Sequence, residues 1–513
     1  MRRTLLVVLA LVAASAALGG WRVLTADETG ELERTAEEYL SAWRRSDWPA
    51  MRRLAAAPGP RFARAHAQML ANLDVESARF RLASVERNDD RGEATFHARL
   101  RVGGLGTWAY EGRLKLVRLD GRWRVAWSPS TLHPALLPGR SLERTRSWPR
   151  RAPILAEDAT PLAADREVIV VGVEPRRVED RRQLLVGLER YAGVDRGDVV
   201  KELTRPGVQP DWFIPVADLR PDTYARVRPQ LHPIPGTVFR RSTGRLAPTD
   251  GFASHVLGVV GDVTAELLDK LGEPYTIGDR VGLSGLERVY ERRLAGEPRG
   301  QIRVVDARGR VVAVVRRFRG RKPRPVRTTL SLAVQAAAER ALDGVEKPAA
   351  IVALDANSGE LRAVASRPRE SFDRALAGRY PPGSTFKIVT TAALLERGIT
   401  PEDVVPCPQT VTVGGKAFRN AERAALGSIS FRTAFAQSCN TAFVQLAARL
   451  DAATLTREAR EFGFGARYTL PLDVAGGRFP RPRDLAELAA AALGQGRVEA
   501  SPAHMATVAA AGA

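Results

Sequence analysis

Residues 379–387 place a proline and glycine turn directly before an apolar helical stretch, in the order Arg-Tyr-Pro-Pro-Gly-Ser-Thr-Phe-Lys. Pro382 and Gly383 stop any preceding element, and the apolar residues that follow recur with helical spacing until Gly398. Ser384 is therefore predicted in a first helical turn, where unpaired backbone N–H groups and the positive end of the helix dipole favour an oxyanion. Lys387 shares that helix face, and burial lowers a lysine's pKa, so the pair suits a nucleophile and its general base.

A second polar motif, Ser438-Cys439-Asn440, lies between two helix-like stretches, 54 residues downstream of Ser384. It is the only Ser-x-Asn in a chain with five asparagines. A Ser-x-x-Lys pair alone would arise by chance in roughly a third of chains of this composition, so the second motif carries much of the weight. A second hydroxyl can relay a proton and an amide can hold a peptide carbonyl, which predicts an acyl-transfer site.

With both motifs the chain resembles a class B penicillin-binding protein, a family marked by Ser-x-x-Lys, Ser-x-Asn and Lys-Thr-Gly. The resemblance is carried by residues 380–387, by residues 438–443 and by the segment Leu493-Gly494-Gln495-Gly496. It implies four catalytic residues: the nucleophile Ser384, the base Lys387, the proton relay Ser438 and the substrate-binding amide of Asn440. The third motif, Lys-Thr-Gly or Lys-Ser-Gly, is absent from the 513 residues. Because it comes later in the family, we expect the sequence to end early and these 513 residues alone to be inactive.

The activity implied by the resemblance is that of a serine-type peptidoglycan D,D-transpeptidase. Ser384 would attack a stem peptide ending in D-Ala-D-Ala and pass the acyl group to an amine of a neighbouring stem. The implied partners are peptidoglycan stem peptides, β-lactam antibiotics, the cytoplasmic membrane through an N-terminal helix, and a separate glycan polymerase. A D,D-carboxypeptidase, which lets water take the acyl group, and a catalytically silent scaffold of a wall-synthesis complex remain open alternatives.

A multidomain fold with four parts is expected: a membrane anchor (1–25), an α+β cone-like domain (26–140), an α+β pedestal or dimerisation domain (141–325) and a truncated α/β transpeptidase domain with an antiparallel sheet (326–513). Residues 31–44 have helical periodicity, and the stretch from Phe96 to Trp127 alternates with period two, interrupted by a turn at Asp120-Gly121. This cone is similar to the nuclear transport factor 2-like module of methicillin-resistance-type penicillin-binding proteins, and we expect it to act as a spacer.

The N-terminus predicts export. Arg2 and Arg3 precede 18 uncharged residues, Thr4 to Trp21, which would span about 27 Å as a helix and could cross a bilayer with the arginines inside. A cleaved signal peptide is the alternative, since Ala14-Ser15-Ala16 could serve a peptidase. We expect a retained single-pass anchor in the cell membrane, with the catalytic domain outside the cytoplasm.

Composition narrows the remaining choices. The net charge is +20, but no nucleic-acid motif accompanies it, so we expect a solvated basic surface. If the charge does bind a partner, anionic lipid head groups or wall polymers are preferred over nucleic acid, because the chain is predicted to be exported. Six scattered histidines show no ligand spacing, which argues against a metal or other cofactor. With two cysteines only, Cys407 and Cys439, no disulfide framework is expected, and Cys439 is predicted to fill a buried slot.

Overall fold

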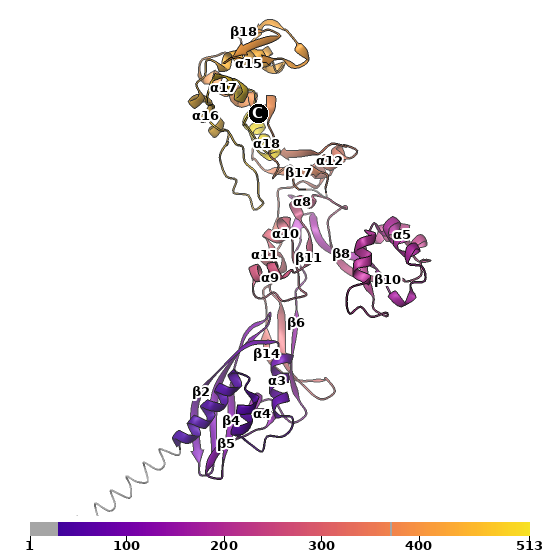
Figure 1. Cartoon of the computed structure of the whole chain (residues 1–513), viewed down its shortest axis with the longest axis vertical. Helices are drawn as coiled ribbons and strands as arrows, with labels where there is room; N and C mark the ends of the chain where they lie inside the picture. Colours follow the sequence, from indigo (N-terminus) through magenta and orange to yellow (C-terminus); the bar gives the residue numbers. More distant parts are fainter. Residues whose placement is uncertain (1–28, 370–371) are drawn as a thin grey trace, which may run out of the picture. The chain divides into compact units, whose positions relative to one another are not determined.

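The computed structural model describes residues 29–369 and 372–513, which form two compact units (Figure 1). The first unit holds the described residues up to 149 together with 262–279 and 295–323; the second holds 150–261, 280–294 and the chain from residue 324. Within these residues no helix is long and apolar enough to cross a bilayer. The predicted anchor, residues 1–25, lies outside the described residues.

The first unit is built on a five-stranded sheet in the order β1-β5-β4-β3-β2. Strands β2 to β5 form antiparallel hairpins, and β1 runs parallel to β5. Asp120 and Gly121 both take positive φ between β4 and β5, as the predicted turn requires. The bounds are β1 (Ala55–Ala56), β2 (Val75–Asn88), β3 (Arg91–Val102), β4 (Gly106–Leu119) and β5 (Arg122–Ala126).

Helices cover one face of this sheet because the alternating strand residues make that face apolar. Phe96, Ala98 and Leu100 are fully buried, and the helix over residues 29–44 buries Leu32 and Tyr39 against them (Figure 1). The predicted helix and alternating strands are thus confirmed. The other helices of this unit are α2 (Trp48–Leu54), α3 (Phe62–Asn72), α4 (Pro129–Leu132) and α9 (Ala265–Leu271). A second sheet has the strand order β14-β13-β6, with β6 (Ser141–Ser147), β13 (Arg299–Val305) and β14 (Val311–Phe318).

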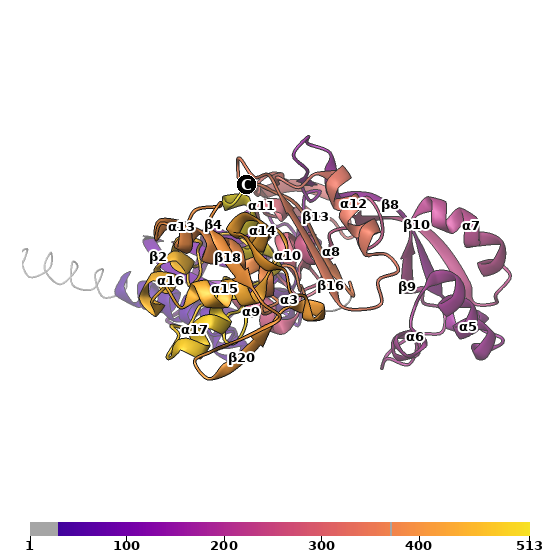
Figure 2. The same ribbon diagram turned by 90° about the horizontal axis from the view of Figure 1, so that it is seen from above.

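The second unit begins with a sheet around β8 (Pro161–Val173), whose apolar residues Val168, Val171 and Val173 are fully buried. Helix α5 starts after the N-cap Asp180 and is capped at its C-terminus by Gly193, which has φ +69. Helices α5, α6 and α7 gather beside β8, β9 and β10 (Figure 2). The bounds are β7 (Ile154–Leu155), β9 (Ile214–Leu219), β10 (Thr237–Leu246), β15 (Val326–Arg327), η1 (Pro175–Arg177), α5 (Arg181–Ala192), α6 (Arg196–Leu203) and α7 (Pro221–Leu231).

A Gly-x-x-Gly-Leu-Glu segment, residues 282–287, forms a tight turn in this unit. Gly285 has φ +56, and a Cβ on Gly282 would lie 2.2 Å from the backbone of Glu287, so both positions require glycine. The short elements here are α8 (Ser254–Leu257), β11 (Val260–Asp262), β12 (Arg280–Gly282), α10 (Gly285–Val289) and α11 (Glu291–Ala295).

The C-terminal part of the second unit carries the two motifs. Helix α12 (Leu332–Leu342) packs on the antiparallel hairpin of β16 (Ala349–Leu354) and β17 (Leu361–Arg367). A separate apolar core surrounds α13 (Lys387–Glu396) and α15 (Asn440–Ala447). The other elements are β18 (Val404–Cys407), β19 (Thr410–Val413), β20 (Lys416–Arg419), η3 (Ala421–Arg423), β21 (Gly427–Ser430), α14 (Phe431–Ala436), α16 (Ala452–Glu461), α17 (Leu485–Ala492) and α18 (Pro502–Ala511).

Candidate active site

Ser384 lies on a 3-10 turn, Gly383–Phe386, that leads directly into α13. The sequence placed it in the first turn of an α-helix, and the tighter turn arises because Gly383 takes φ +57 while the Thr385 hydroxyl donates to the Pro382 carbonyl at 2.7 Å. The Ser384 side chain is exposed, whereas Phe386 is fully buried and stacks on Phe479 with ring centroids 5.4 Å apart. The turn therefore presents the hydroxyl to solvent while the apolar core fixes its other side.

The segment around Gly494 holds this turn in place. The Gly383 amide donates to the Gly494 carbonyl at 2.9 Å, and Tyr380 exchanges two backbone hydrogen bonds with Ala500. A Cβ on Gly494 would lie 2.2 Å from the Gly383 carbonyl oxygen, so this close approach requires glycine. The Leu493-Gly494-Gln495-Gly496 segment, noticed in the sequence only through the resemblance, thus positions the serine turn.

Lys387 connects the two motifs. Its ammonium nitrogen Nζ donates to the Ser438 carbonyl at 2.8 Å, to the Ser438 hydroxyl at 2.9 Å and to Asn440 Oδ1 at 2.7 Å. Only 2% of the residue is exposed, and Nζ lies 5.2 Å from the centroid of the Phe443 ring. Burial lowers the pKa of Lys387 to about 8.

The backbone of the second motif is held in a left-handed conformation. Ser438 has φ +54, and its side chain is exposed, while Cys439 is buried and Asn440 begins α15. A non-glycine residue in this region carries strain and is typical of functional sites. Asn440 Nδ2 donates to the Arg419 carbonyl at 3.1 Å. The amide predicted to hold a substrate is therefore bonded internally at both ends, to Lys387 and to Arg419.

The structure brings Lys387, Ser438 and Asn440 into direct contact, and it places Ser384 one helical turn before Lys387. Among the hydrogen bonds of the described residues there is none from Lys387 to Ser384, because its three N–H groups all point to the second motif. When Lys387 loses a proton, it keeps two donors and gains a lone pair, which can accept from the Ser438 hydroxyl. The cluster can therefore take up a proton at Nζ and pass it to an exposed hydroxyl.

A disulfide between Cys407 and Cys439 joins β18 to the second motif. The sequence prediction of a buried Cys439 is confirmed, since the residue is 2% exposed, but the expectation of no disulfide is wrong. The two cysteines are 32 residues apart and meet because α15 packs on β18. An even cysteine count in a chain predicted to be exported was the available signal.

Asn420 is a positioning residue that sequence reasoning missed. It is 7% exposed, its Nδ2 donates to the Ala424 carbonyl at 2.9 Å and to the Pro408 carbonyl at 3.0 Å, and its Oδ1 accepts from the Thr441 amide at 3.0 Å. These bonds fix the first turn of α15 directly after Asn440. Nothing in the sequence around Asn420 marks this role, because all of its partners are distant along the chain or come from an irregular loop.

Removing the disulfide through Cys407→Ala with Cys439→Ala should lower the local free energy of unfolding by roughly 3–4 kcal/mol, the value expected for freeing a loop of this length. Hydrogen exchange of the α15 and β18 amides measures the effect. Reductant should destabilise the wild-type protein similarly and leave the double variant unchanged. A loss below about 1 kcal/mol would show that the remaining contacts suffice to hold the motif.

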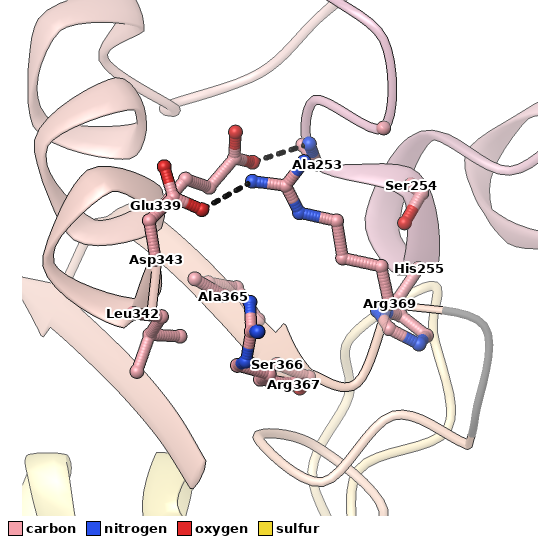
Figure 3. A pocket seen from close by; sticks show the side chains of 12 residues that line it. Ala253, Ser254, His255, Glu339, Leu342, Asp343, Ala365, Ser366, Arg367 and Arg369 are labelled. Carbon is pink, nitrogen blue, oxygen red and sulfur yellow. Dashed lines mark hydrogen bonds and ion pairs between the residues drawn. The ribbon is translucent and has the colours of Figure 1, made fainter. Parts of the chain in front are cut away.

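Two other polar groupings do not fit a substrate or cofactor. Figure 3 shows a pocket between α8, α12 and β17, whose volume of about 10 Å³ is enough for one water. Its two acids already bind protein groups, because Glu339 accepts from the Ala253 amide and Asp343 pairs with Arg369. The carboxylates of Glu396, Glu458 and Glu461 lie within 4.8 Å of one another, but Arg457 pairs with the first and third. We assign no metal to this group.

Three segments of the chain match models of known protein families. Residues 349–513 match the family described as penicillin binding protein transpeptidase domain, and residues 146–327 match the penicillin-binding protein dimerisation domain. Residues 31–140 match the NTF2-like N-terminal transpeptidase domain. The chain thus has the domain composition of a class B penicillin-binding protein, with NTF2-like, dimerisation and transpeptidase domains in that order.

Named relatives match different shares of the chain. Penicillin-binding protein 3 of Bacillus subtilis is 24% identical over 84% of this chain and 70% of its own length. Peptidoglycan D,D-transpeptidase PbpA of Mycobacterium tuberculosis is 35% identical over 38% of this chain, which spans 47% of that protein. A solved complex between a penicillin-binding protein, PBP2, and MreC from Helicobacter pylori matches with a TM-score of 0.53 and 21% identity, over 71% of this chain and 75% of that one. At this identity the structure supports the fold alone.

Proposed function

We propose that this protein is a membrane-anchored peptidoglycan D,D-transpeptidase that works outside the cytoplasm through a Ser384 acyl-enzyme. The observation that carries the proposal is the placement of Lys387 Nζ, which lies within 2.9 Å of oxygen atoms of both Ser438 and Asn440, one turn after the exposed Ser384. The match to a penicillin-binding transpeptidase domain, and the PbpA relative named a peptidoglycan D,D-transpeptidase, support the substrate class.

In the proposed reaction the Ser384 hydroxyl attacks the penultimate carbonyl of a stem peptide ending in D-Ala-D-Ala. Neutral Lys387 takes the hydroxyl proton, the Ser384 amide contributes one N–H to the oxyanion, and Ser438 delivers a proton to the departing D-Ala amine. The ester then passes its acyl group to an amine of a neighbouring stem, which restores the Ser384 hydroxyl. Asn440 would bind the acyl side chain after exchanging its bond to Arg419 for one to the substrate.

Partners follow from this chemistry. Stem peptides are the substrate, β-lactams are the covalent inhibitors, and a separate glycan polymerase supplies the strands to be joined. The solved structure of similar fold is a complex of PBP2 with a second protein, MreC, and by analogy we propose that this chain also docks a protein partner.

The test of the reaction is incubation of the full-length protein with a stem-peptide thioester and a D-amino acid acceptor, with products followed by mass spectrometry. We expect a peptide joined to the acceptor, and no product from the Ser384→Ala variant. Free acid without acceptor product would indicate a carboxypeptidase. Absence of both products, together with absence of penicillin labelling, would favour the silent scaffold.

The pH dependence of acylation should report Lys387. Since the base must be neutral and burial lowers its pKa to about 8, the acylation rate should rise about tenfold per pH unit well below 8 and level off above it. Labelling with a fluorescent penicillin from pH 6 to 9.5 measures this profile. A flat profile, or one that falls with rising pH, would exclude Lys387 as the base.

A further inference from the structure

A cavity of about 430 Å³ opens beside α3 in the first unit. The apolar core of this unit includes Trp43, Phe96 and Trp108, and other buried members of the same core line the cavity. Its volume falls in the range of small-molecule sites, about 300–1,000 Å³. The walls come from α3, from α4 and from the connection to β6.

The floor of the cavity is apolar and the entrance is cationic. The buried residues Met69, Leu132, Leu136 and Leu142, each no more than 4% exposed, line the floor. The wall also includes Trp127, whose buried indole N–H has no hydrogen-bond partner within the part of the chain that the structure describes. The lining also includes Arg61, Arg64 and Arg140, and it contains no acidic residue.

The three arginines have no ion-pair partner among residues 29–369 and 372–513. Arg61 and Arg64 are exposed at the start of α3, while Arg140 is half-buried. Arg140 also interacts electrostatically with Asp306, but that carboxylate accepts two hydrogen bonds from Arg310. Exposed arginines such as Arg101 and Arg113 of the same unit pair with carboxylates, whereas these three arginines lie beside apolar side chains with no acid in the lining.

Helical spacing explains how charge and apolar surface come together here. Arg61, Ala65, Gln68 and Asn72 recur along one face of α3, while Phe62 and His66 point into the core on the other. A ligand lying along the first face would place an aliphatic chain over Met69 and the leucines and an anionic head at the arginines. Guanidinium groups bind phosphate oxygens in fork geometry, which favours a phosphate head over a single carboxylate.

We propose that this cavity binds an amphiphile with one aliphatic chain inserted and a phosphate head held by Arg61, Arg64 and Arg140. Two sources share this chemistry, a membrane phospholipid and a free phosphate-bearing amphiphile. The predicted anchor, residues 1–25, directly precedes the cone-like domain, which would keep the cavity close to a bilayer surface. The proposal is independent of the transpeptidase activity, since the cavity and the candidate active site lie in different units.

The test is isothermal titration of the full chain, in a neutral maltoside detergent, with octyl phosphate below its micelle-forming concentration. We expect saturable binding of octyl phosphate to the wild-type protein, and binding at least tenfold weaker to the double variant Arg61→Ala with Arg64→Ala. The matched control is the double variant Arg91→Ala with Arg122→Ala, which removes the same amount of charge from exposed positions on β3 and β5 of the same unit. It should leave octyl phosphate binding unchanged. Weaker binding in the control variant, or unchanged binding in the cavity variant, would overturn the assignment.

Two further probes separate the parts of the ligand. Inorganic phosphate carries the head alone and octyl glucoside the chain with a neutral head, and each should bind at least tenfold more weakly than octyl phosphate. Equal binding of either probe would overturn the amphiphile proposal in favour of a plain anion site or a plain apolar cavity. Lipid nanodiscs then identify the source of the ligand. If the ligand is a bilayer lipid, phosphatidylglycerol nanodiscs should displace octyl phosphate. If neither phosphatidylglycerol nor phosphatidylcholine nanodiscs displace it, the ligand is a free amphiphile.

Discussion

Replacing Lys387 with methionine is expected to lower the rate of acylation by penicillin by about 10³, within the range of 10²–10⁴ for a positioned general base. Methionine keeps the length and apolar body of the side chain, so the core around Phe443 stays filled. Ser438 loses two hydrogen bonds and Asn440 loses one, at about 1 kcal/mol apiece, which a protein of this size tolerates. The rate of labelling by a fluorescent penicillin measures the change.

Lys347→Met is the matched control, because Lys347 is an exposed lysine of the same unit with the same charge. We expect it to acylate at the wild-type rate. Circular dichroism of both variants separates catalysis from folding. Wild-type acylation by Lys387→Met would remove the lysine from the mechanism, and an unfolded Lys387→Met protein would show that its role is structural.

The second large effect concerns stability and lies at Glu287, which is 1% exposed. Its carboxylate accepts from Arg151 at 2.7 Å and from Arg245 at 2.8 Å, and Arg151 also pairs with the buried Glu291 at 2.7 Å. Glu287→Ala leaves two nearly buried guanidinium groups without this partner. Breaking a buried ion pair from one side costs about 3–5 kcal/mol. We expect that loss in the free energy of unfolding, measured by urea denaturation.

An exposed ion pair of the same unit provides the contrast. Glu402 and Arg432 lie 2.8 Å apart with 72% of each side chain exposed, so Glu402→Ala should cost no more than about 1 kcal/mol. If Glu287→Ala were equally mild, the network would not hold the turn at residues 282–287. Full stability in Glu287→Gln would show that hydrogen bonding, and not charge, is what the arginines require.

Local signals in the sequence predicted the elements that position the site. The Pro-Pro-Gly turn and the helical period after it identified the serine turn and α13, and the Asp120-Gly121 turn identified a hairpin, because each depends on residues adjacent in the chain. The groups that accept hydrogen bonds from Lys387 could not be predicted, since Ser438 reaches the lysine only when α13 and α15 pack together. Cys407, Asn420 and Gly494 act through partners from distant segments, and spacing along the chain carries no information about such contacts.

The measurement that tests the central claim most directly is peptide mapping of the penicillin-treated, full-length protein by mass spectrometry. The account predicts one penicilloyl group per protein, attached to the Ser384 hydroxyl in the peptide that contains residues 380–387. It also predicts that Ser384→Ala carries no adduct under the same conditions. An adduct on another residue, or an unmodified protein that is fully folded and complete, would contradict the assignment of Ser384 as the nucleophile.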